Sequence, residues 1–591
     1  MAKQGDGRNG SYVSRRDFLR YSLSAGVMIW AGSQFPREAE AQTRFKVRGG
    51  DPATVFPQSV ASGDPQPNGI VLWTRIGSLK GGSTVAYEIT RDTTFRKPIL
   101  RGTAQTSADR DNTVKVQINR TELSPFTTYY YRFIYNGTAS RTGRFKTLPA
   151  ETGAVPGDRG VRFGYISCQD YTNGYYTALA HLAQEDVDFV VHLGDYIYET
   201  VGEESFQGGG PAERQFSFPD GGDEALTLRD YRFAYGQYKS DKNLQAVHEK
   251  FAFITIWDDH EFANDAYQTT APDAESGTTP VPERREAANQ AWAEYTQTGV
   301  PYDPSGGPLE EIQIYRSFAF GDLMELVMTD QRLYRDGPPC GDTTPERYLT
   351  PGCEAVNDPN RTTLGSDQKT WFLDKIRSSP RTWKIWGSEL QFGQCKLLNT
   401  YLQGGAPEIF PTVVQGPEQL GGVYVTLDNW DGYQAERLEI TQAIKSSGVK
   451  NFVVITGDIH TFIANYVKEA YDNPLDPPVG VEFVCGSVTS SNLTEIATFG
   501  QGTGAIPRPS DPDAFTLAAK ASNPHYEYFN SDTHGYNIME VTPAGLSCTM
   551  VAVSTIKQAQ AEKSILKRFR VPVNEVSIID ETSPVPTSAG A

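Results

Sequence analysis

Residues able to bind metal ions or move protons follow four short apolar runs of the chain. The clearest run is VDFVVHLGDYIYE, residues 187–199, in which apolar residues give way to Gly194 and Asp195 and then to tyrosines. The other runs are GVRFGYISC, FAFITIWDDHE and NFVVITGDIH, which end on Cys168, on Asp258 to His260, and on Asp458 and His460. Short apolar runs of this kind are typical of strands buried on both faces, and α/β folds carry their chemistry where such strands end. The sequence therefore predicts four buried strands that deliver metal ligands to one end of a sheet.

A single aspartate after a strand is more often a turn or helix-capping residue than a ligand. Here the four endings together carry one thiol, two imidazoles, a phenol and several carboxyl groups. Burying so many carboxylates without cations costs several kcal/mol for each uncompensated charge. A metal cluster accounts for the pattern better than four unrelated turns.

The chain has 591 residues, of which 38% are hydrophobic, and a formal net charge of −18. This length leaves room for several domain-sized units. The acidic balance argues against a stable complex with nucleic acid or with an anionic membrane, because both reward basic patches. Small phosphate esters are not excluded as substrates.

Residues 1–41 are typical of a twin-arginine export signal. Arg15 and Arg16 precede a modest apolar stretch at residues 23–32, and the sequence Ala39-Glu40-Ala41 offers a cleavage site. A solvated basic terminus is the alternative. We therefore expect a periplasmic or secreted protein carried by the twin-arginine translocation machinery. No other segment approaches the roughly 18 to 20 apolar residues that span a bilayer, so no transmembrane anchor is expected.

The remaining chain is expected to fold as two units with a tail. Residues 45–150 show short alternating runs such as GIVLWTRI and TVKVQINR, which predict an N-terminal antiparallel β-sandwich. Residues 161–556 alternate strands with helical stretches at 174–185 and 282–296, which predicts a layered α/β fold. For residues 557–591 a basic helix at 562–570 and a flexible tail are expected. Cys340 and Cys353 bracket a short Pro/Gly-rich loop, so a disulfide between them is plausible in an oxidising compartment.

Three of the strand endings resemble blocks of the metallophosphatase superfamily. GDYIY fits its G-D-x-x-Y block, DDHE resembles G-N-H-E, and GDIH resembles G-H-x-H, while Cys168 stands where an aspartate is expected. Together with WDDHEFANDAY, TDQRLYR and NPHYEYFNSDTHGY, the chain is similar to the PhoD family of secreted alkaline phosphatases and phosphodiesterases over nearly its whole mature length. The resemblance implies a metallophosphatase-type layered β-sandwich core flanked by helices, with an N-terminal antiparallel β-sandwich domain.

The metals that the resemblance implies are Fe3+ and Ca2+. Cys168, Asp195, Tyr198 and His460 would bind the ferric ion, for which a tyrosinate is a suitable ligand. Asp195 would bridge to a harder cation held by Asp259 and Asp458. Tyr198 is favoured over Tyr196, because a helical turn after Gly194 brings it to the side of Asp195. Asn264 and Asp265 could reach the same side, and by residue type alone Zn2+ is an alternative.

Two residues are expected to act on the substrate. An ester would be cleaved by a metal-activated hydroxide, with His260 steadying the phosphoryl group or protonating the leaving oxygen. The alternative for His260 is a brace for Glu261. Arg332 offers a fork for phosphate oxygens, or else a surface salt bridge. The resemblance adds Asn523 and His525 as weaker candidates, and the structural histidines are expected to be His181, His192 and His248.

The predicted function is a secreted metal-dependent phosphoesterase that hydrolyses phosphate monoesters, diesters or both and releases phosphate. One alternative is a diester-preferring phosphodiesterase that resembles phospholipase D. Another, from a different class, is a non-catalytic periplasmic protein that binds metal or phosphate.

Overall fold

The computed structural model describes residues 45–582 except 80, 204–206, 208, 275–276, 398–421 and 500–511. The predicted export signal at residues 1–41 lies outside the described residues. Within the described part of the chain, no helix is long and apolar enough to cross a membrane.

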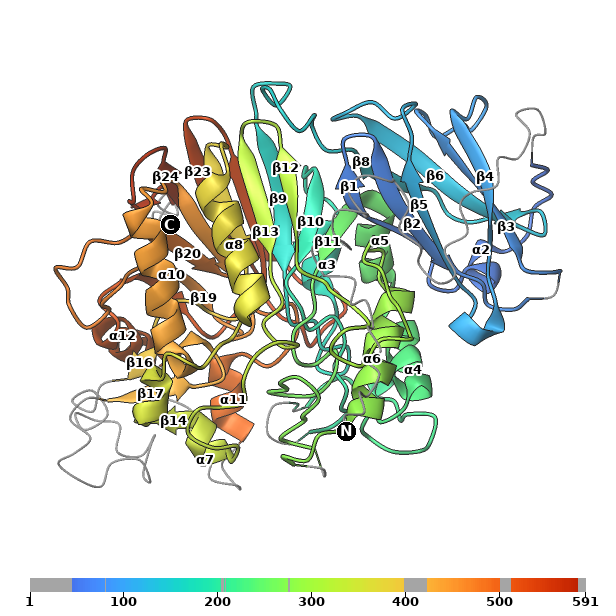
Figure 1. The fold of residues 1–591 in the computed structure, drawn as a ribbon. Coiled ribbons are helices and arrows are strands. Elements are labelled where there is room, and N and C mark those ends of the chain that lie inside the picture. The colour runs from blue at the N-terminus through green and yellow to red at the C-terminus, as the bar shows by residue number, and fades with distance from the viewer. Residues whose placement is uncertain are drawn as a thin grey trace, which may run out of the picture.

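Two large β-sheets pack against each other at the centre of the molecule (Figure 1). The first sheet has the order β25 (Ile579–Asp580), β24 (Lys563–Pro572), β23 (Gly545–Val553), β22 (His534–Val541), β9 (Val161–Ile166), β10 (Phe189–His192), β11 (Ala252–Thr255), β1 (Val60–Gln66), β2 (Gly69–Arg75) and β5 (Thr113–Asn119). The second has the order β12 (Arg316–Phe320), β13 (Met324–Met328), β15 (Trp383–Gly387), β18 (Phe452–Thr456), β20 (Gly480–Val484), β19 (Phe462–Val467) and β21 (Tyr526–Asn530).

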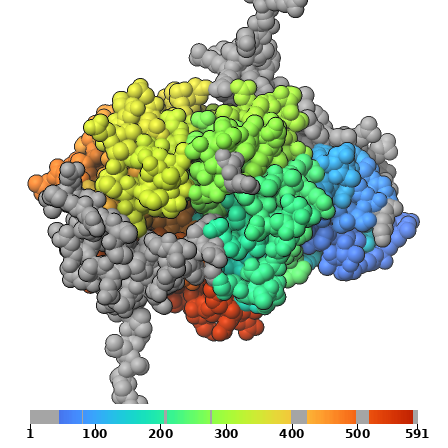
Figure 2. Space-filling view, turned by 90° about the horizontal axis from the view of Figure 1, so that it is seen from below, coloured from blue at the N-terminus to red at the C-terminus, as the bar shows by residue number. Residues whose placement is uncertain are grey.

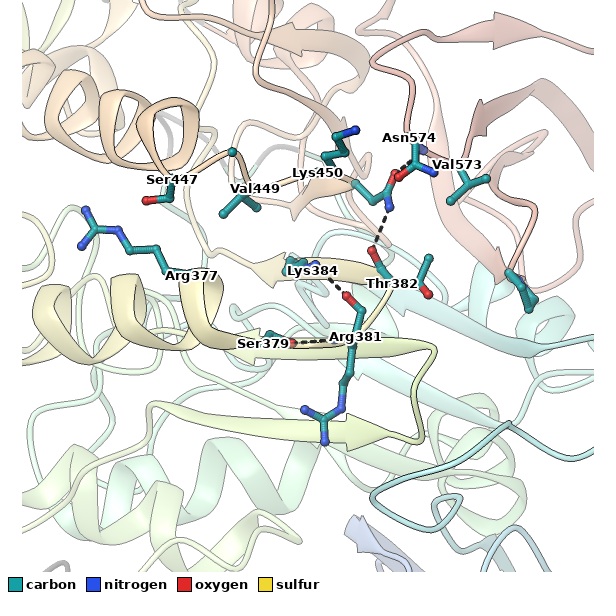
Figure 3. Close-up of a pocket in the computed structure, with 13 residues that line it drawn as sticks. Arg377, Ser379, Arg381, Thr382, Lys384, Ser447, Val449, Lys450, Val573 and Asn574 are labelled. Carbon is teal, nitrogen blue, oxygen red and sulfur yellow. Dashed lines mark hydrogen bonds between the residues drawn. The ribbon is translucent and has the colours of Figure 1, made fainter.

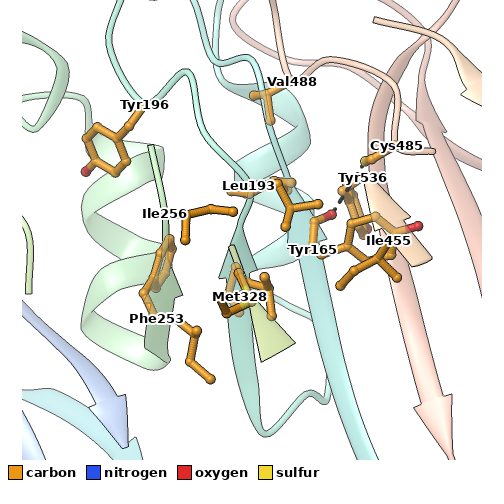
Figure 4. Close-up of a cluster of buried hydrophobic side chains, with 14 of the residues drawn as sticks. Tyr165, Leu193, Tyr196, Phe253, Ile256, Met328, Ile455, Cys485, Val488 and Tyr536 are labelled. Carbon is orange, nitrogen blue, oxygen red and sulfur yellow. Dashed lines mark hydrogen bonds between the residues drawn. The ribbon is translucent and has the colours of Figure 1, made fainter. Parts of the chain in front are cut away.

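The main hydrophobic core lies between these sheets. Phe189 of β10 stacks on Phe320 of β12 with ring centroids 5.1 Å apart, and buried residues of both sheets belong to one apolar cluster. In Figure 4, Leu193 and Ile256 from the first sheet's strand ends lie near Met328 and Ile455 from the second. The strands β9, β10 and β11 are parallel and buried on both faces, as their continuous apolar sequences predict.

Helices cover the outer faces. α8 (Ser366–Ser378) and α10 (Gln434–Ser446) pack their apolar residues against Trp386 and Val454 of the second sheet. α3 (Thr177–Leu182) packs on β22 and β23 and beside α5 (Lys242–Lys250), while α4 (Leu228–Tyr238) packs on α6 (Pro282–Tyr295). The helices expected at residues 174–185 and 282–296 are thus present as α3 and α6, and the layered α/β fold is confirmed.

The N-terminal antiparallel sheet contains β4 (Leu100–Gln105), β3 (Thr84–Thr90), β6 (Thr128–Tyr135), β7 (Thr138–Ala139) and β8 (Gly143–Lys146). It follows the short α2 (Pro52–Val55) and packs its apolar residues against β1, β2 and β5. In Figure 2, which views the molecule from below, this region is the blue lobe beside the green segments. Because β1 pairs in parallel with β11, the first sheet continues without interruption across the expected division at residues 150–161.

The prediction of a helix at residues 562–570 is wrong. These residues form β24, which pairs with β23 from Lys563 to Pro572. Phe569 and Val571 are both buried, two residues apart, while the side chains between and after them are less buried. This period of two is typical of a strand, and pairing within the sheet outweighs the helical preference of the Lys- and Arg-rich segment.

A small three-stranded sheet is built on a loop closed by a disulfide. Cys340 and Cys353 are bonded, with Cα atoms 5.8 Å apart, so the expected disulfide is present. The loop contains α7 (Thr344–Arg347) and β14 (Tyr348–Thr350), and β14 pairs with β17 (Val423–Thr426), which also pairs with β16 (Lys396–Leu397). Two further α-helices in the described part of the chain are α11 (Leu493–Phe499) and α12 (Pro512–Ser522).

A groove of about 550 Å³ opens where β15 and β18 begin (Figure 3). Arg377, Arg381, Lys384 and Lys450 are among the residues that line it. The predicted metal ligand Asp458 follows the opposite end of β18. The groove therefore lies at the other end of the second sheet from the predicted chemistry.

Candidate metal centre

Strand ends from both large sheets supply the predicted ligands. Cys168, Asp195 and Asp259 follow three adjacent strands of the first sheet, β9, β10 and β11, and Asp458 follows β18 of the second. Gly194 makes the approach possible, because its φ is 110° and a Cβ there would lie 2.4 Å from Cβ of Asp258. The ligands predicted for one sheet edge therefore meet between two sheets.

The first metal-type group contains Cys168, Asp195 and His460, whose ligand atoms lie within 4.8 Å of one another. The Tyr198 hydroxyl lies 3.1 Å from Asp195 Oδ2 and 3.3 Å from His460 Nε2. His460 Nδ1 lies 2.6 Å from the main-chain oxygen of Ser491, to which it donates. This bond directs the other nitrogen, Nε2, at the group. Burial lowers the pKa of His460 to about 4, so a neutral imidazole offers its lone pair there.

A second group contains Asp195, Asp259 and His260, and it shares Asp195 with the first. Oδ1 of Asp195 is buried and has no hydrogen-bond partner among the described residues. Burial raises the pKa of Asp195 well above its ordinary value, with a further rise from Asp259, and burial and Asp195 do the same to Cys168. A buried carboxylate oxygen without a partner, on a residue that belongs to two ligand groups, fits a residue that bridges cations.

Asp259, Asp265 and Asp428 form a third group, which fits a cation less well. Arg332 and Arg335 pair with Asp428, at 2.7 and 3.1 Å, and Arg347 pairs with Asp265. Guanidinium groups therefore already offset these carboxylates. Burial opposes ionisation of Asp259, but Arg332 and His260 lower its pKa to about 2.

Four of the predicted ligands share an uncommon backbone conformation. Cys168, Asp195, Asp458 and His460 have φ angles of 57°, 56°, 63° and 53°. Non-glycine residues pay a steric cost in this left-handed region, and such residues gather at functional sites. Glu261 helps to hold the turns, since its carboxylate accepts the main-chain N–H groups of Asp195, Tyr196 and Asp258 at 2.7–2.9 Å. The strained backbone conformation thus directs these side chains inward.

His260 lies beside the ligands and is held by a carboxylate. Its Nδ1 is 2.7 Å from Oε2 of Glu199, and its ring stacks on Tyr198 with centroids 3.9 Å apart. Burial alone would lower the pKa of His260, but Glu199, Asp259 and Asp195 raise it well above its ordinary value. These carboxylates favour the imidazolium form, which can donate a proton. Glu261 accepts from main-chain N–H groups, and the alternative role of His260 as a brace for Glu261 stays a prediction.

Arg332 is fully buried and surrounded by carboxylates. Its Nε pairs with Asp258 and its NH1 with Asp428, while NH2 lies 3.6 Å from Asp259 Oδ2 and 3.7 Å from Asp458 Oδ1. The surface salt bridge is wrong, because these ion pairs are buried. Contact of Arg332 with phosphate oxygens stays a prediction, since two of its nitrogens are paired and NH2 makes no hydrogen bond with the described residues. Asp458 remains the most solvent-facing predicted ligand, with 19% of its side chain exposed.

Several other candidates lie apart from the ligands. The Tyr196 hydroxyl bonds to His248, so the preference for Tyr198 agrees with the geometry. Asn523 and His525 bond to main-chain groups of Lys396 and Gln394 rather than to any ligand. His192 and His181 bond to main-chain groups as structural histidines do.

Three contacting residues were missed by sequence reasoning. Glu199 orients His260, Ser490 donates to the Tyr198 hydroxyl at 2.6 Å, and Asp428 pairs with Arg332. Asp428 had a signal, since it follows the apolar strand β17 as the other aspartates follow theirs. Glu199 stands one residue after Tyr198 in the first run, whereas Ser490 lies in a loop with no distinguishing pattern.

Comparisons with known proteins cover most of the chain. The PhoD-like phosphatase family model matches residues 163–550, and the model of the PhoD-like phosphatase N-terminal domain matches residues 41–149. Alkaline phosphatase D of Bacillus subtilis strain 168 is 34% identical over 496 residues, which are 83% of this chain and 76% of the relative. A solved structure described as "Structure of PhoD" superposes with a TM-score of 0.75 at 30% identity, covering 91% of this chain and 94% of the other.

Proposed function

The chain belongs to the PhoD-like phosphatase family and is therefore a phosphoester hydrolase, and we propose that it cleaves phosphate monoesters and diesters at a centre of bound metal ions. Six residues form this candidate metal centre: Cys168, Asp195, Tyr198, Asp259, Asp458 and His460. Asp195 carries the proposal, because it belongs to both ligand groups and its buried Oδ1 has no hydrogen-bond partner among the described residues.

The donor types fit two kinds of cation. Cys168, Tyr198 and His460 offer sulfur, phenolic oxygen and nitrogen, a mixed set that suits Fe3+. Asp259 and Asp458 offer carboxylate oxygens, which suit Ca2+, and Asp195 is placed to serve both. Zn2+ is the alternative for the first set, because thiolate and imidazole are also its ligands.

Cations held here would supply Lewis acidity that offsets the phosphoryl charge and lowers the pKa of an attacking water. The chain's own residues supply a proton donor and a counter-charge for the carboxylates. Glu199 holds Nδ1 of His260 and raises its pKa, so the ring would present a proton to a phosphoryl or leaving oxygen. Arg332 pairs with Asp258 and Asp428 and lies beside Asp259 and Asp458, so its positive charge offsets the repulsion among these carboxylates.

The catalytic region is assigned to residues 161–556, behind an N-terminal sandwich at 45–150 and before a C-terminal segment at 557–591. Residues 1–41 are proposed to be a twin-arginine signal, which would make the enzyme periplasmic or secreted. Replacing Arg15 and Arg16 with lysine should keep the protein in the cytoplasm with residues 1–41 attached. Normal export of that variant would contradict this assignment.

Hydrolysis of p-nitrophenyl phosphate and bis(p-nitrophenyl) phosphate tests the proposed reaction. Both esters should turn over, activity should fall after chelation, and iron with calcium should restore it. Comparing the two rates distinguishes a broad phosphoesterase from the diester-preferring alternative. A chelator-treated protein that keeps full activity, or a reconstituted protein that cleaves neither ester, would contradict the proposal.

A further inference from the structure

The loop closed by Cys340–Cys353 reaches the edge of the candidate metal centre. Within it, Arg347 ends α7 and Tyr348 begins β14, which pairs with β17. The main-chain N–H of Leu427 donates to the main-chain oxygen of Arg347 at 2.7 Å. The loop is thus fixed at the strand whose end carries Asp428, which pairs with Arg332.

Two side chains of this loop hold one aspartate. The guanidinium of Arg347 is 1% exposed and pairs with Asp265 and Asp273. The Tyr348 hydroxyl lies 2.8 and 2.7 Å from the two carboxylate oxygens of Asp265. These donors occupy the Asp265 carboxylate, which makes it an anchor for the loop.

Asp265 connects the loop to the proposed ligand Asp259. Its main-chain N–H donates to Oδ2 of Asp259 at 2.6 Å, and its φ of 53° is in the left-handed region. A non-glycine residue keeps that conformation only where its surroundings enforce it. The contacts with Arg347 and Tyr348 are such surroundings, and they fix the direction of the N–H that orients Asp259.

We propose that Arg347 and Tyr348 are positioning residues of the metal centre, which act through Asp265 on Asp259, and that the Cys340–Cys353 disulfide keeps them in place. The inference rests on the proposed function and deepens it, since neither residue touches a proposed ligand directly. The competing account is that the loop only stabilises the fold.

Variants of the full chain separate these accounts. Arg347→Gln should lower kcat and the calcium affinity of the metal-free protein by about 10- to 100-fold, as loss of an outer partner of a metal ligand does. Arg347→Lys should lower kcat and calcium affinity less than Arg347→Gln does, because it keeps the positive charge but not the paired geometry. Tyr348→Phe should change both in the same direction by a smaller factor. KM should change less than kcat, since substrate contacts are untouched.

Arg381→Gln is the matched control. Arg381 pairs with Glu325 in a partly buried ion pair just before the start of β15. This is the end of the second sheet that lies opposite the candidate metal centre. Loss of this ion pair should change the melting temperature without changing kcat or calcium affinity. Cys340→Ser with Cys353→Ser should reproduce the direction of the Arg347→Gln effect.

The inference is overturned if Arg347→Gln and Tyr348→Phe bind calcium and turn over within twofold of the unaltered enzyme, whatever their melting temperatures. If Arg347→Gln does not fold, Tyr348→Phe decides, because it removes a single hydroxyl and keeps the ion pairs. An unaltered protein that binds calcium but cleaves no ester would contradict the proposed function instead, and the calcium titrations would still test the inference.

Discussion

The ring of Tyr198 stacks on the imidazole of His260 with centroids 3.9 Å apart, while its hydroxyl lies 3.1 Å from Oδ2 of Asp195. One side chain therefore contacts both a residue of the first ligand group and His260, the proposed proton donor. Its phenol is buried, and burial together with Asp195 raises its pKa well above the ordinary value. A tyrosinate here thus requires a strongly Lewis-acidic cation.

Tyr198→Phe keeps the stacked ring and removes only the hydroxyl. We expect iron bound per chain to fall and any visible absorption from a ferric phenolate to disappear, while the calcium content changes less. Elemental analysis and the absorption spectrum of the purified variant measure both. An unchanged iron content and spectrum would show that Tyr198 is not a ligand.

His260→Asn should lower kcat by about 10²- to 10⁴-fold, as expected for a lost general acid. Metal content should stay near that of the unaltered enzyme. Glu199→Gln should give a smaller loss, since it weakens the bond that orients the ring. If His260 protonates the leaving oxygen, the loss should be larger for alkyl esters than for p-nitrophenyl esters. Equal losses would instead indicate that His260 stabilises the phosphoryl group.

Arg332→Gln should destabilise the fold by about 3–5 kcal/mol, because it leaves buried carboxylates without a counter-charge. Arg332 is 0% exposed and pairs with Asp258 and Asp428. Urea unfolding of the variant measures the change in the free energy of unfolding. A variant of full stability whose only defect is a raised KM would show that Arg332 binds substrate after all.

Lys239, which is not one of the proposed ligands, gives a test of pH-dependent stability. Its ammonium lies 4.5 Å from the ring centroid of Trp73, and burial, with a smaller effect of Lys115, lowers its pKa from 10.5 to about 7. Between these pH values the unfolded chain binds a proton that the folded chain does not, so protonation favours unfolding and stability rises with pH. Below about pH 7 both the folded and the unfolded chain carry this proton, and the free-energy cost of burying the charged ammonium is greatest.

Lys239→Met should therefore raise the melting temperature most at pH 7 and below, and the gain should shrink towards pH 10.5. Thermal unfolding of both proteins across this pH range measures the difference. A gain that is constant with pH would mean that Lys239 keeps its ordinary pKa in the folded protein.

The parts of the site that could be predicted are those attached to regular elements. Asp195 and Asp458 follow buried strands after a glycine, and this local pattern is visible without the fold. Ser490 and Glu199 act through contacts that only the packed loops create. The role of Arg332 could not be read from its own segment, because the carboxylates that surround it come from the ends of three separate strands.

In the fold, too, local sequence patterns predicted some elements, whereas pairing between distant segments determines others. Continuous apolar runs predicted the parallel strands β9 to β11, since both of their faces are covered. Residues 562–570 were expected to be helical because Lys and Arg favour helices, but pairing with β23 decides their structure. The parallel pairing of β1 with β11 joins residues far apart in the chain, and no local pattern indicates it.

Metal content per chain, measured in the enzyme purified from cells that export it and in its Asp195→Asn variant, tests the central claim most directly. The account predicts iron and calcium in the unaltered enzyme and a loss of both in the variant, because Asp195 belongs to both ligand groups. Loss of only one metal would contradict the bridging position. An unaltered enzyme that hydrolyses phosphate esters without bound metal would contradict the metal centre itself.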